Sequence, residues 1–149
     1  MRNFYLIFML VCFMGGMILS AKAEEKEPLI IEMLNKRGKD KMLYGQDVAK
    51  IDVGQTITWT PDSKGHNVQF ISVPDGVEKV KSKLSKEFSY TFEQEGVYLY
   101  VCTPHATMGM IGMVIVGESD VNLDEVLDYK FRGKSKKKFK KIVKLLEDA

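Results

Sequence analysis

The chain has 149 residues, of which 45% are hydrophobic and 28% are charged, so it has room for one globular domain and no need of a second. Its formal net charge of +2 comes from 22 basic and 20 acidic residues, and so small an excess gives no indication of nucleic-acid binding. Any electrostatic preference for a partner must therefore depend on where the lysines lie.

The first 23 residues predict a secretory signal peptide. Arg2 precedes an apolar run from Phe4 to Ile18, and the small-residue triplet Ala21-Lys22-Ala23 follows it. A membrane anchor is the alternative, but the run falls short of the roughly 20 residues needed to cross a bilayer. We therefore expect cleavage after Ala23, which leaves residues 24–149 as the exported domain, with no stable membrane association.

Loss of this segment changes the charge and the cysteine content. Without Arg2 and Lys22 the mature chain has 20 basic and 20 acidic residues. Cys12 is lost as well, so Cys102 is the only remaining cysteine and cannot form a disulfide within the chain. An unpaired cysteine in an exported protein is a liability unless it is buried, used as a nucleophile or bound to a metal.

From Leu29 to Val116, short apolar runs alternate with turn signals, which predicts strands rather than helices. In Thr56–Thr60, for example, Ile57 and Trp59 should point inward with a period of two. Strands at this spacing indicate a two-sheet sandwich. The other expected strands cover residues 29–34, 66–71, 88–92, 97–102 and 111–116.

After Gly117 the composition changes to helix-forming residues, and we expect two helices from about residue 121. Asn122 is the predicted cap of the first helix, which Gly133 ends, and Ser135 is the predicted cap of the second. The second helix is amphipathic, which favours packing on the sandwich, whereas a helix lying on a membrane surface is the alternative. Its apolar stripe contains Phe139, Ile142, Val143, Leu145 and Leu146.

The side chains with distinctive chemistry follow the strand expected at residues 97–102. A nine-residue stretch begins at Cys102, includes His105 and ends at Met110, and His66, the only other histidine, lies 36 residues before the cysteine. A thiolate, two imidazoles and a weak thioether form the ligand set of a trigonal copper site with a long axial bond. Such a set suits both Cu(I) and Cu(II), so the pattern predicts one-electron transfer.

Other kinds of site could use some of these residues. Cys102 with a histidine base could be a catalytic nucleophile, but this leaves Met110 without a role and no third group to orient the base. Zinc could occupy the site, although structural zinc usually takes more cysteines and catalytic zinc a carboxylate or a third histidine. A protein that stores or delivers copper is another alternative, against which the enclosed ligand set argues. We therefore expect a copper protein and no enzyme.

These residues give the chain a resemblance to the cupredoxins, and within them to the pseudoazurins, over nearly the whole mature length. The resemblance implies an all-β Greek-key sandwich of about eight strands, a plastocyanin-like domain with two C-terminal α-helices, and one type 1 copper ion. The matching motifs are Met33-Leu34-Asn35-Lys36, Lys64-Gly65-His66-Asn67-Val68, Pro74-Asp75-Gly76, and Cys102-Thr103-Pro104-His105 with Met108-Gly109-Met110.

The resemblance also implies a role for each residue of the site. His66 and His105 would bind copper through Nδ1, Cys102 through its thiolate and Met110 as the long axial ligand, whereas Met108 falls at a position that does not bind.

Around the ligands, the resemblance implies a supporting set of contacts. The backbone N–H of Asn67 would donate to the Cys102 sulfur, and its side chain would hold Thr103. Asn35 would support the site similarly, and Met42 would lie against His105.

Finally, the resemblance implies a periplasmic shuttle that exchanges electrons through the outer edge of His105 with a copper nitrite reductase, a similar terminal reductase or a c-type cytochrome. An apolar patch around His105 would contain Met42, Pro104, Ala106 and Met108. A rim of lysines would steer brief encounters of the monomer with its partners. The predicted rim consists of Lys36, Lys64, Lys81 and Lys83.

Overall fold

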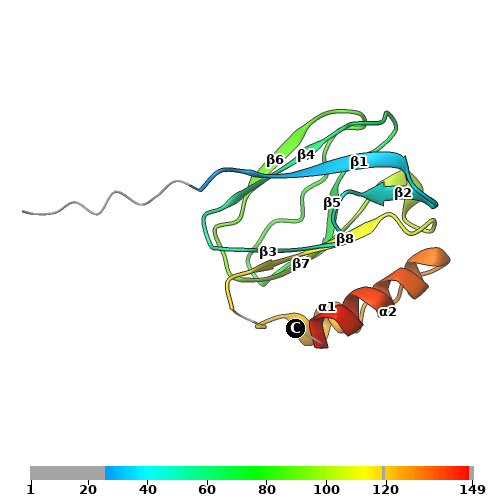
Figure 1. Ribbon diagram of the computed structural model, residues 1–149. Coiled ribbons are helices and arrows are strands. Elements are labelled where there is room, and N and C mark those ends of the chain that lie inside the picture. The colour runs from blue at the N-terminus through cyan, green and yellow to red at the C-terminus, as the bar shows by residue number, and fades with distance from the viewer. Residues whose placement is uncertain (1–25, 119, 148–149) are drawn as a thin grey trace, which may run out of the picture.

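The computed structural model describes residues 26–118 and 120–147. It has three layers, in which two β-sheets pack face to face and two helices cover the outer face of one sheet (Figure 1). The predicted signal peptide and its cleavage after Ala23 lie outside the described residues and remain predictions. Within the described ranges, neither helix has the length and apolar character needed to cross a bilayer.

The two sheets have four strands each. The first sheet has the order β2-β1-β4-β6 and the second the order β3-β8-β7-β5. β1 pairs in parallel with β4, and β3 in parallel with β8, while the remaining pairs are antiparallel. The predicted eight-stranded Greek-key sandwich is confirmed. The strands are β1 (Leu29–Arg37), β2 (Asp40–Tyr44), β3 (Val48–Ile51), β4 (Thr56–Thr60), β5 (Gln69–Ser72), β6 (Phe88–Thr91), β7 (Gly96–Val101) and β8 (Ile111–Val116).

Two hydrophobic cores lie on opposite faces of the second sheet. The inner core, between the sheets, is rich in aromatic residues and includes Tyr44, Trp59, Phe70, Tyr98, Tyr100, Cys102 and Met110. The outer core, between the second sheet and the helices, consists mainly of aliphatic residues and includes Val97, Leu99, Val101, Ile111, Met113, Val126, Phe139 and Ile142.

β7 is the strand that both cores share, and all six of its residues are buried. Alternate side chains point to opposite faces, so Tyr98 and Tyr100 enter the inner core while Val97, Leu99 and Val101 enter the outer core. This double burial explains why the segment reads as a continuous apolar run rather than as an alternating strand.

The strand predictions need correction in number and in bounds, since β1 continues to Arg37, beyond its predicted end at Leu34. β2 and β3 were not predicted, because both are short and carry charged residues such as Asp40 and Lys50. The strand expected from His66 begins only at Gln69. His66, Asn67 and Val68 form a buried connection instead, and their backbone groups bond partly to side chains.

Both predicted helices are present, as α1 (Leu123–Leu127) and α2 (Lys134–Glu147), but the predicted caps are confirmed only in part, since Asn122 occupies the N-cap position of α1 whereas Ser135 does not occupy that of α2. The Asn122 side chain makes no capping bond and instead pairs with the backbone of Val97. Ser135 lies inside α2, and its hydroxyl donates to the Ala106 carbonyl.

The ends and the apolar stripe of the helices also differ in part from expectation. α1 ends at Leu127, well before Gly133, and Gly133 directly precedes α2. Phe139 and Ile142 are buried as expected, whereas Leu145 is 59% exposed and does not belong to the packed face. Packing of α2 on the sandwich, rather than its isolation at the surface, is confirmed.

Candidate metal centre

Three of the four predicted site residues bring ligand atoms together at one end of the sandwich. The Nδ1 atoms of His66 and His105 are 3.1 Å apart, and the Cys102 sulfur lies 3.7 Å from the first and 3.3 Å from the second. His66 and Cys102 are fully buried, while His105 is partly exposed. One soft sulfur and two imidazole nitrogens therefore converge on one point.

Backbone bonds hold the loop that carries Cys102, His105 and Met110. His105 N–H donates to the Cys102 carbonyl at 3.0 Å, Met110 N–H donates to the His105 carbonyl at 3.3 Å, and Cys102 N–H donates to the Met110 carbonyl at 3.0 Å. Thr103–His105 form one 3₁₀ turn, for which the fixed φ of Pro104 is suited. The three residues are thus tied to one another before any ion is considered.

Met108 and Met110 point to different surroundings, although they are only two residues apart. Between them Gly109 has a φ of 103°, a conformation that side chains rarely adopt. Met110 is fully buried in the inner core with Cys102, whereas Met108 is 42% exposed. The burial of Met110 beside the cysteine distinguishes it from Met108 as a fourth ligand.

His66 is held in one orientation by Asn35. The Asn35 side-chain oxygen lies 2.9 Å from Nε2 of His66, so Nε2 carries the proton and Nδ1 keeps its lone pair. The β1–β2 ladder skips the pair Asn35–Met42 and resumes on either side. At this gap the Asn35 N–H donates to the Ser63 hydroxyl, and Met42 has a φ of 51°. Backbone strain of this kind often accompanies functional sites.

Asn67 connects the His66 segment to the cysteine loop. Its side-chain oxygen accepts from the Thr103 N–H at 2.8 Å, and its amide donates to the Thr103 hydroxyl at 3.0 Å. Its backbone N–H also bonds to the Cys102 sulfur. The supporting contacts predicted for Asn67 and Asn35 are therefore confirmed.

Sequence reasoning missed several residues that support this connection. The Tyr44 hydroxyl donates to the Asn67 carbonyl at 2.7 Å, and the Ser82 hydroxyl accepts from the Val68 N–H at 2.9 Å. The Ser85 N–H donates to the His66 carbonyl at 2.8 Å. Tyrosines and serines are common and carry no spacing signal, so nothing in the sequence singled these residues out.

The electrostatics of the site favour a neutral His66 ring and a protonated Cys102 thiol. Burial, assisted by the neighbouring His105, lowers the pKa of His66, which keeps its ring neutral and able to donate a lone pair. Burial raises the pKa of Cys102, and the N–H groups of Asn67 and His105 only partly oppose this. A catalytic thiolate requires the opposite shift and access to a substrate, so the fully buried Cys102 argues against the nucleophile alternative.

The same atoms fit a metal ion. All three ligand atoms lie within 4.8 Å of one another, which suits a single ion bound at about 2.0–2.3 Å by nitrogen and sulfur. The geometry alone would accept zinc or copper. Met110 lies in the same buried cluster and carries a thioether, a ligand that copper sites use and zinc sites do not need. This residue therefore favours copper.

The residues predicted for the patch and the rim differ in exposure. Pro104 and Met108 are exposed, and Ala106 is partly exposed. Each of the four predicted rim lysines is exposed. In the sequence, each lies one or two residues from a residue whose hydrogen bonds are described above. Lys36 follows Asn35, Lys64 precedes His66 by two residues, and Lys81 and Lys83 flank Ser82.

Comparison with known proteins identifies the metal. Residues 31–117 match the family described as copper binding proteins, plastocyanin/azurin family. The pseudoazurin of Paracoccus pantotrophus is 36% identical over 110 residues, which cover 72% of this chain and 76% of that protein. A pseudoazurin of Methylorubrum extorquens is 36% identical over 108 residues, which cover 71% of each chain.

Solved structures agree in fold and in extent. The crystal structure of pseudoazurin from Methylobacterium extorquens matches with a TM-score of 0.77 and 30% identity, covering 80% of this chain and 99% of that one. Native pseudoazurin from Hyphomicrobium denitrificans matches with a TM-score of 0.72 and 37% identity, covering 76% and 94%. The chain therefore belongs to the plastocyanin/azurin family of copper-binding proteins, in which its relatives are pseudoazurins, and it is a blue copper electron carrier rather than an enzyme.

Proposed function

We propose that His66, Cys102, His105 and Met110 hold one copper ion, and that the protein passes single electrons between redox proteins in the periplasm. The observation that carries this proposal is the convergence of two Nδ1 atoms and one sulfur within 4.8 Å. The burial of Met110 in the cluster that contains Cys102 supports its role as the fourth, axial ligand.

When bound, copper supplies one-electron redox chemistry between Cu(I) and Cu(II). The chain contributes a set of ligands that stays in place during the change of charge. Asn35 fixes His66, Asn67 fixes the cysteine loop, and the three backbone bonds fix His105 and Met110 relative to Cys102. Rigid supporting bonds of this kind orient the ligands and tune the metal.

His105 is the proposed path for electrons into and out of the site. It is the one partly exposed member of a cluster whose other members, His66 and Cys102, are fully buried. A partner that contacts Pro104 and Met108 would therefore come closer to the ring edge of His105 than to any of the other proposed ligands.

The proposed partners are a copper nitrite reductase or similar terminal reductase and a c-type cytochrome, met by a monomer of this protein. The apolar surface beside His105 suits a small, transient contact. Charge on Lys36, Lys64, Lys81 and Lys83 would raise the association rate with acidic partner surfaces and lose its effect as salt increases. The periplasmic location rests on the predicted signal peptide of residues 1–23.

The first experiment measures the visible absorption spectrum of the exported protein after addition of Cu(II). An intense blue thiolate-to-copper band is expected, and Cys102→Ala should abolish it. Met110→Gln should keep a coloured site with a shifted spectrum, because it replaces only the weak axial ligand. A Cys102→Ala protein that remains blue, or a wild-type protein that binds Zn²⁺ but stays colourless with copper, would refute the proposed ligand set.

A second experiment tests the proposed rim. The rate of electron transfer to a c-type cytochrome is measured for Lys64→Glu/Lys81→Glu and for the control Lys137→Glu/Lys141→Glu, which changes net charge equally on the exposed face of α2. The rim variant should be slower by about tenfold at low salt, and the difference should shrink as salt rises. Equal rates in the two variants would argue against the rim.

A further inference from the structure

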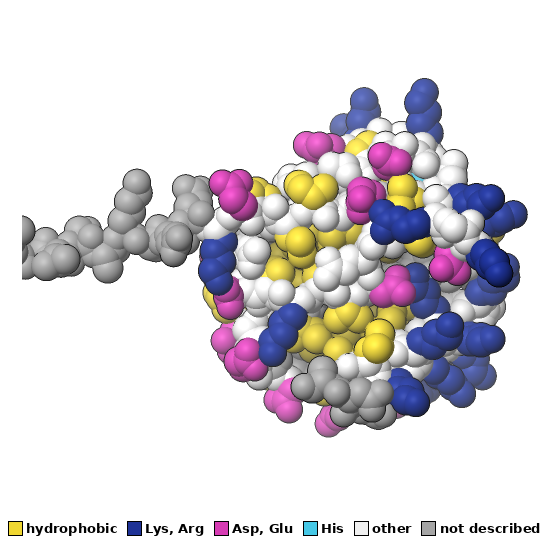
Figure 2. Space-filling view, viewed as in Figure 1, with side chains coloured by type: hydrophobic (Ala, Val, Ile, Leu, Met, Phe, Trp, Pro, Cys, Tyr) yellow, Lys and Arg dark blue, Asp and Glu magenta, His cyan; other side chains and the backbone are white. Residues whose placement is uncertain are grey.

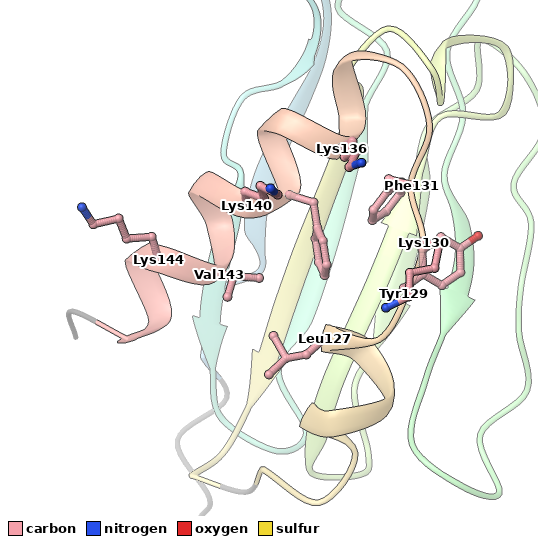
Figure 3. Close-up of a pocket in the computed structure, with 9 residues that line it drawn as sticks. Leu127, Tyr129, Lys130, Phe131, Lys136, Lys140, Val143 and Lys144 are labelled. Carbon is pink, nitrogen blue, oxygen red and sulfur yellow. The ribbon is translucent and has the colours of Figure 1, made fainter.

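A second concave surface lies on the helix layer. It has a volume of about 570 Å³ and lies between α2 and the segment that leads to it from α1 (Figure 3). Its apolar lining consists of Leu127, Tyr129, Phe131, Phe139 and Val143. Leu127 and Tyr129 are 37% and 38% exposed, so apolar surface is open to solvent here. Exposed apolar surface in a concave site is typical of a binding groove.

Lysines border this groove along its length. Lys136, Lys140 and Lys144 follow one another at intervals of four residues on α2, and Lys130 comes from the opposite segment (Figure 3). Four residues of helix rise about 6 Å, so the row places positive charges about 6 Å apart over two turns. Among the described side chains, Lys130 is the only one of these four in an ion pair, with Asp128.

We propose that this groove binds an acidic amphipathic segment of a partner protein. The distribution of charge decides between possible occupants. A fatty acid or similar amphiphile carries its charge at one end and would need lysines only there. A flat membrane surface would not enter a groove. A peptide with an apolar stripe and acidic residues at intervals of three or four matches both the apolar floor and the repeating lysines.

The three aromatic residues of the lining pack in a row with tilted rings, Tyr129 against Phe131 at a centroid distance of 4.7 Å and Phe131 against Phe139 at 5.0 Å. They give the groove a firm aromatic base, which is the kind of surface that anchors an apolar side chain of a partner. The row of lysines would then set the direction and position of the segment, since charge contributes more to specificity than to affinity.

This groove is separate from the proposed electron-transfer surface. Its lining residues all belong to α1, α2 and the segment between them, and none is a proposed copper ligand or rim lysine. The two surfaces adjoin at the start of α2, where the Ser135 hydroxyl donates to the carbonyl of Ala106, so a partner seated in the groove would lie beside the loop of His105. The inference concerns a holding contact, in addition to the brief contact through which electrons pass.

The test uses the copper-loaded protein and a fluorescently labelled synthetic peptide as long as α2, 14 residues, with leucines in a helical stripe flanked by glutamates. Binding is measured by fluorescence anisotropy for wild type, for Lys136→Glu/Lys140→Glu and for the control Lys137→Glu/Lys141→Glu. All four lysines are exposed, and the two variants have the same net charge. We expect the groove variant to bind about tenfold more weakly and the control to bind within about twofold of wild type.

Other results would overturn the proposal. Equal weakening in both variants would mean nonspecific attraction to a basic helix. Equal binding of a scrambled peptide of the same composition would mean that the apolar stripe does not matter. Tight binding to phosphatidylglycerol vesicles with none to the peptide would assign α2 to a membrane surface instead. NMR shifts on peptide addition should map to Val143 and Phe131, and shifts confined to the copper loop would also contradict the groove.

Discussion

The inner and outer cores share the second sheet but support different properties of the molecule. The inner core is built from large aromatic rings and contains Cys102 and Met110, so the proposed copper site is continuous with it. The outer core is mostly aliphatic and is closed by two helices. It meets the copper loop at Val101, Ala106 and Ile111 and through hydrogen bonds at the start of α2, but none of the proposed ligands belongs to it. Damage to the inner core should therefore affect both stability and the metal centre, whereas damage to the outer core should affect stability alone.

The largest effect is expected from Trp59→Ala in the inner core. Trp59 is fully buried and packs against Phe70, Phe88 and Tyr100, with centroid distances of 6.2, 5.7 and 5.3 Å. Its removal should lower the free energy of unfolding by about 3–5 kcal/mol. Urea unfolding measures this change, and the blue band should weaken as well. The control Trp59→Phe should lose much less stability. An unaltered blue band in Trp59→Ala would contradict the proposed dependence of the copper site on this core.

A smaller loss is expected from Phe139→Ala in the outer core. Phe139 is 7% exposed and is covered by a pair of helices that can partly close the cavity. The free energy of unfolding should therefore fall by about 3 kcal/mol, the low end for such changes. The blue band should keep its position and intensity. Leu145→Ala, at a residue 59% exposed, should change stability by less than about 0.5 kcal/mol. A shifted band in Phe139→Ala would show that the two cores are not separable.

The next largest loss of stability is expected from Asn122→Ala, because this side chain joins the helix layer to β7. Its amide oxygen accepts from the Val97 N–H and its amide nitrogen donates to the Val97 carbonyl, both at 2.8 Å. Removal leaves two buried backbone groups unpaired, at a cost of about 1–3 kcal/mol in the free energy of unfolding. Asn122→Asp, which keeps only the acceptor, should fall between wild type and alanine. If the midpoint of urea unfolding of Asn122→Ala equals that of wild type, the two bonds to Val97 contribute nothing to stability.

Ser135→Ala is expected to have the smallest effect on stability and to be the most informative about coupling between the layers. The Ser135 hydroxyl donates to the carbonyl of Ala106, next to His105, and the Lys134 N–H donates to the Thr107 carbonyl at 2.8 Å. We expect a loss of about 0.5–1.5 kcal/mol together with a measurable change in reduction potential. Lys137→Ala, on the exposed face of the same helix, serves as control. An unchanged potential in Ser135→Ala would make the outer layer purely structural.

The predictability of the fold varied with the environment of each segment. Alternation identified Thr56–Thr60 with its observed bounds, and a high content of branched residues identified Ile111–Val116. Asn122 stands at the predicted cap position, but its side chain bonds to Val97, and Ser135 lies inside its helix with its hydroxyl bonded to Ala106. Local patterns do not contain such long-range partners.

The candidate site was more predictable than its support. Scarcity made His66 and Cys102 conspicuous, since the mature chain has two histidines and one cysteine. The anchoring of His66 by Asn35 followed from family resemblance rather than from any pattern. Tyr44 and Ser82 were missed entirely, because their importance depends on the segments that the fold places beside Asn67 and Val68.

The position of β7 has a consequence for the hydrogen exchange of the segments joined to it. The strand is buried on both faces and paired on both edges, so its amide protons should be among the slowest to exchange with solvent. Cys102 continues from this rigid strand, and its own N–H is bonded to Met110. Three of the groups proposed to meet the ion, on Cys102, His105 and Met110, are thus joined by backbone bonds to the most protected part of the fold. The amide protons of this loop should accordingly exchange more slowly than those of an ordinary exposed loop.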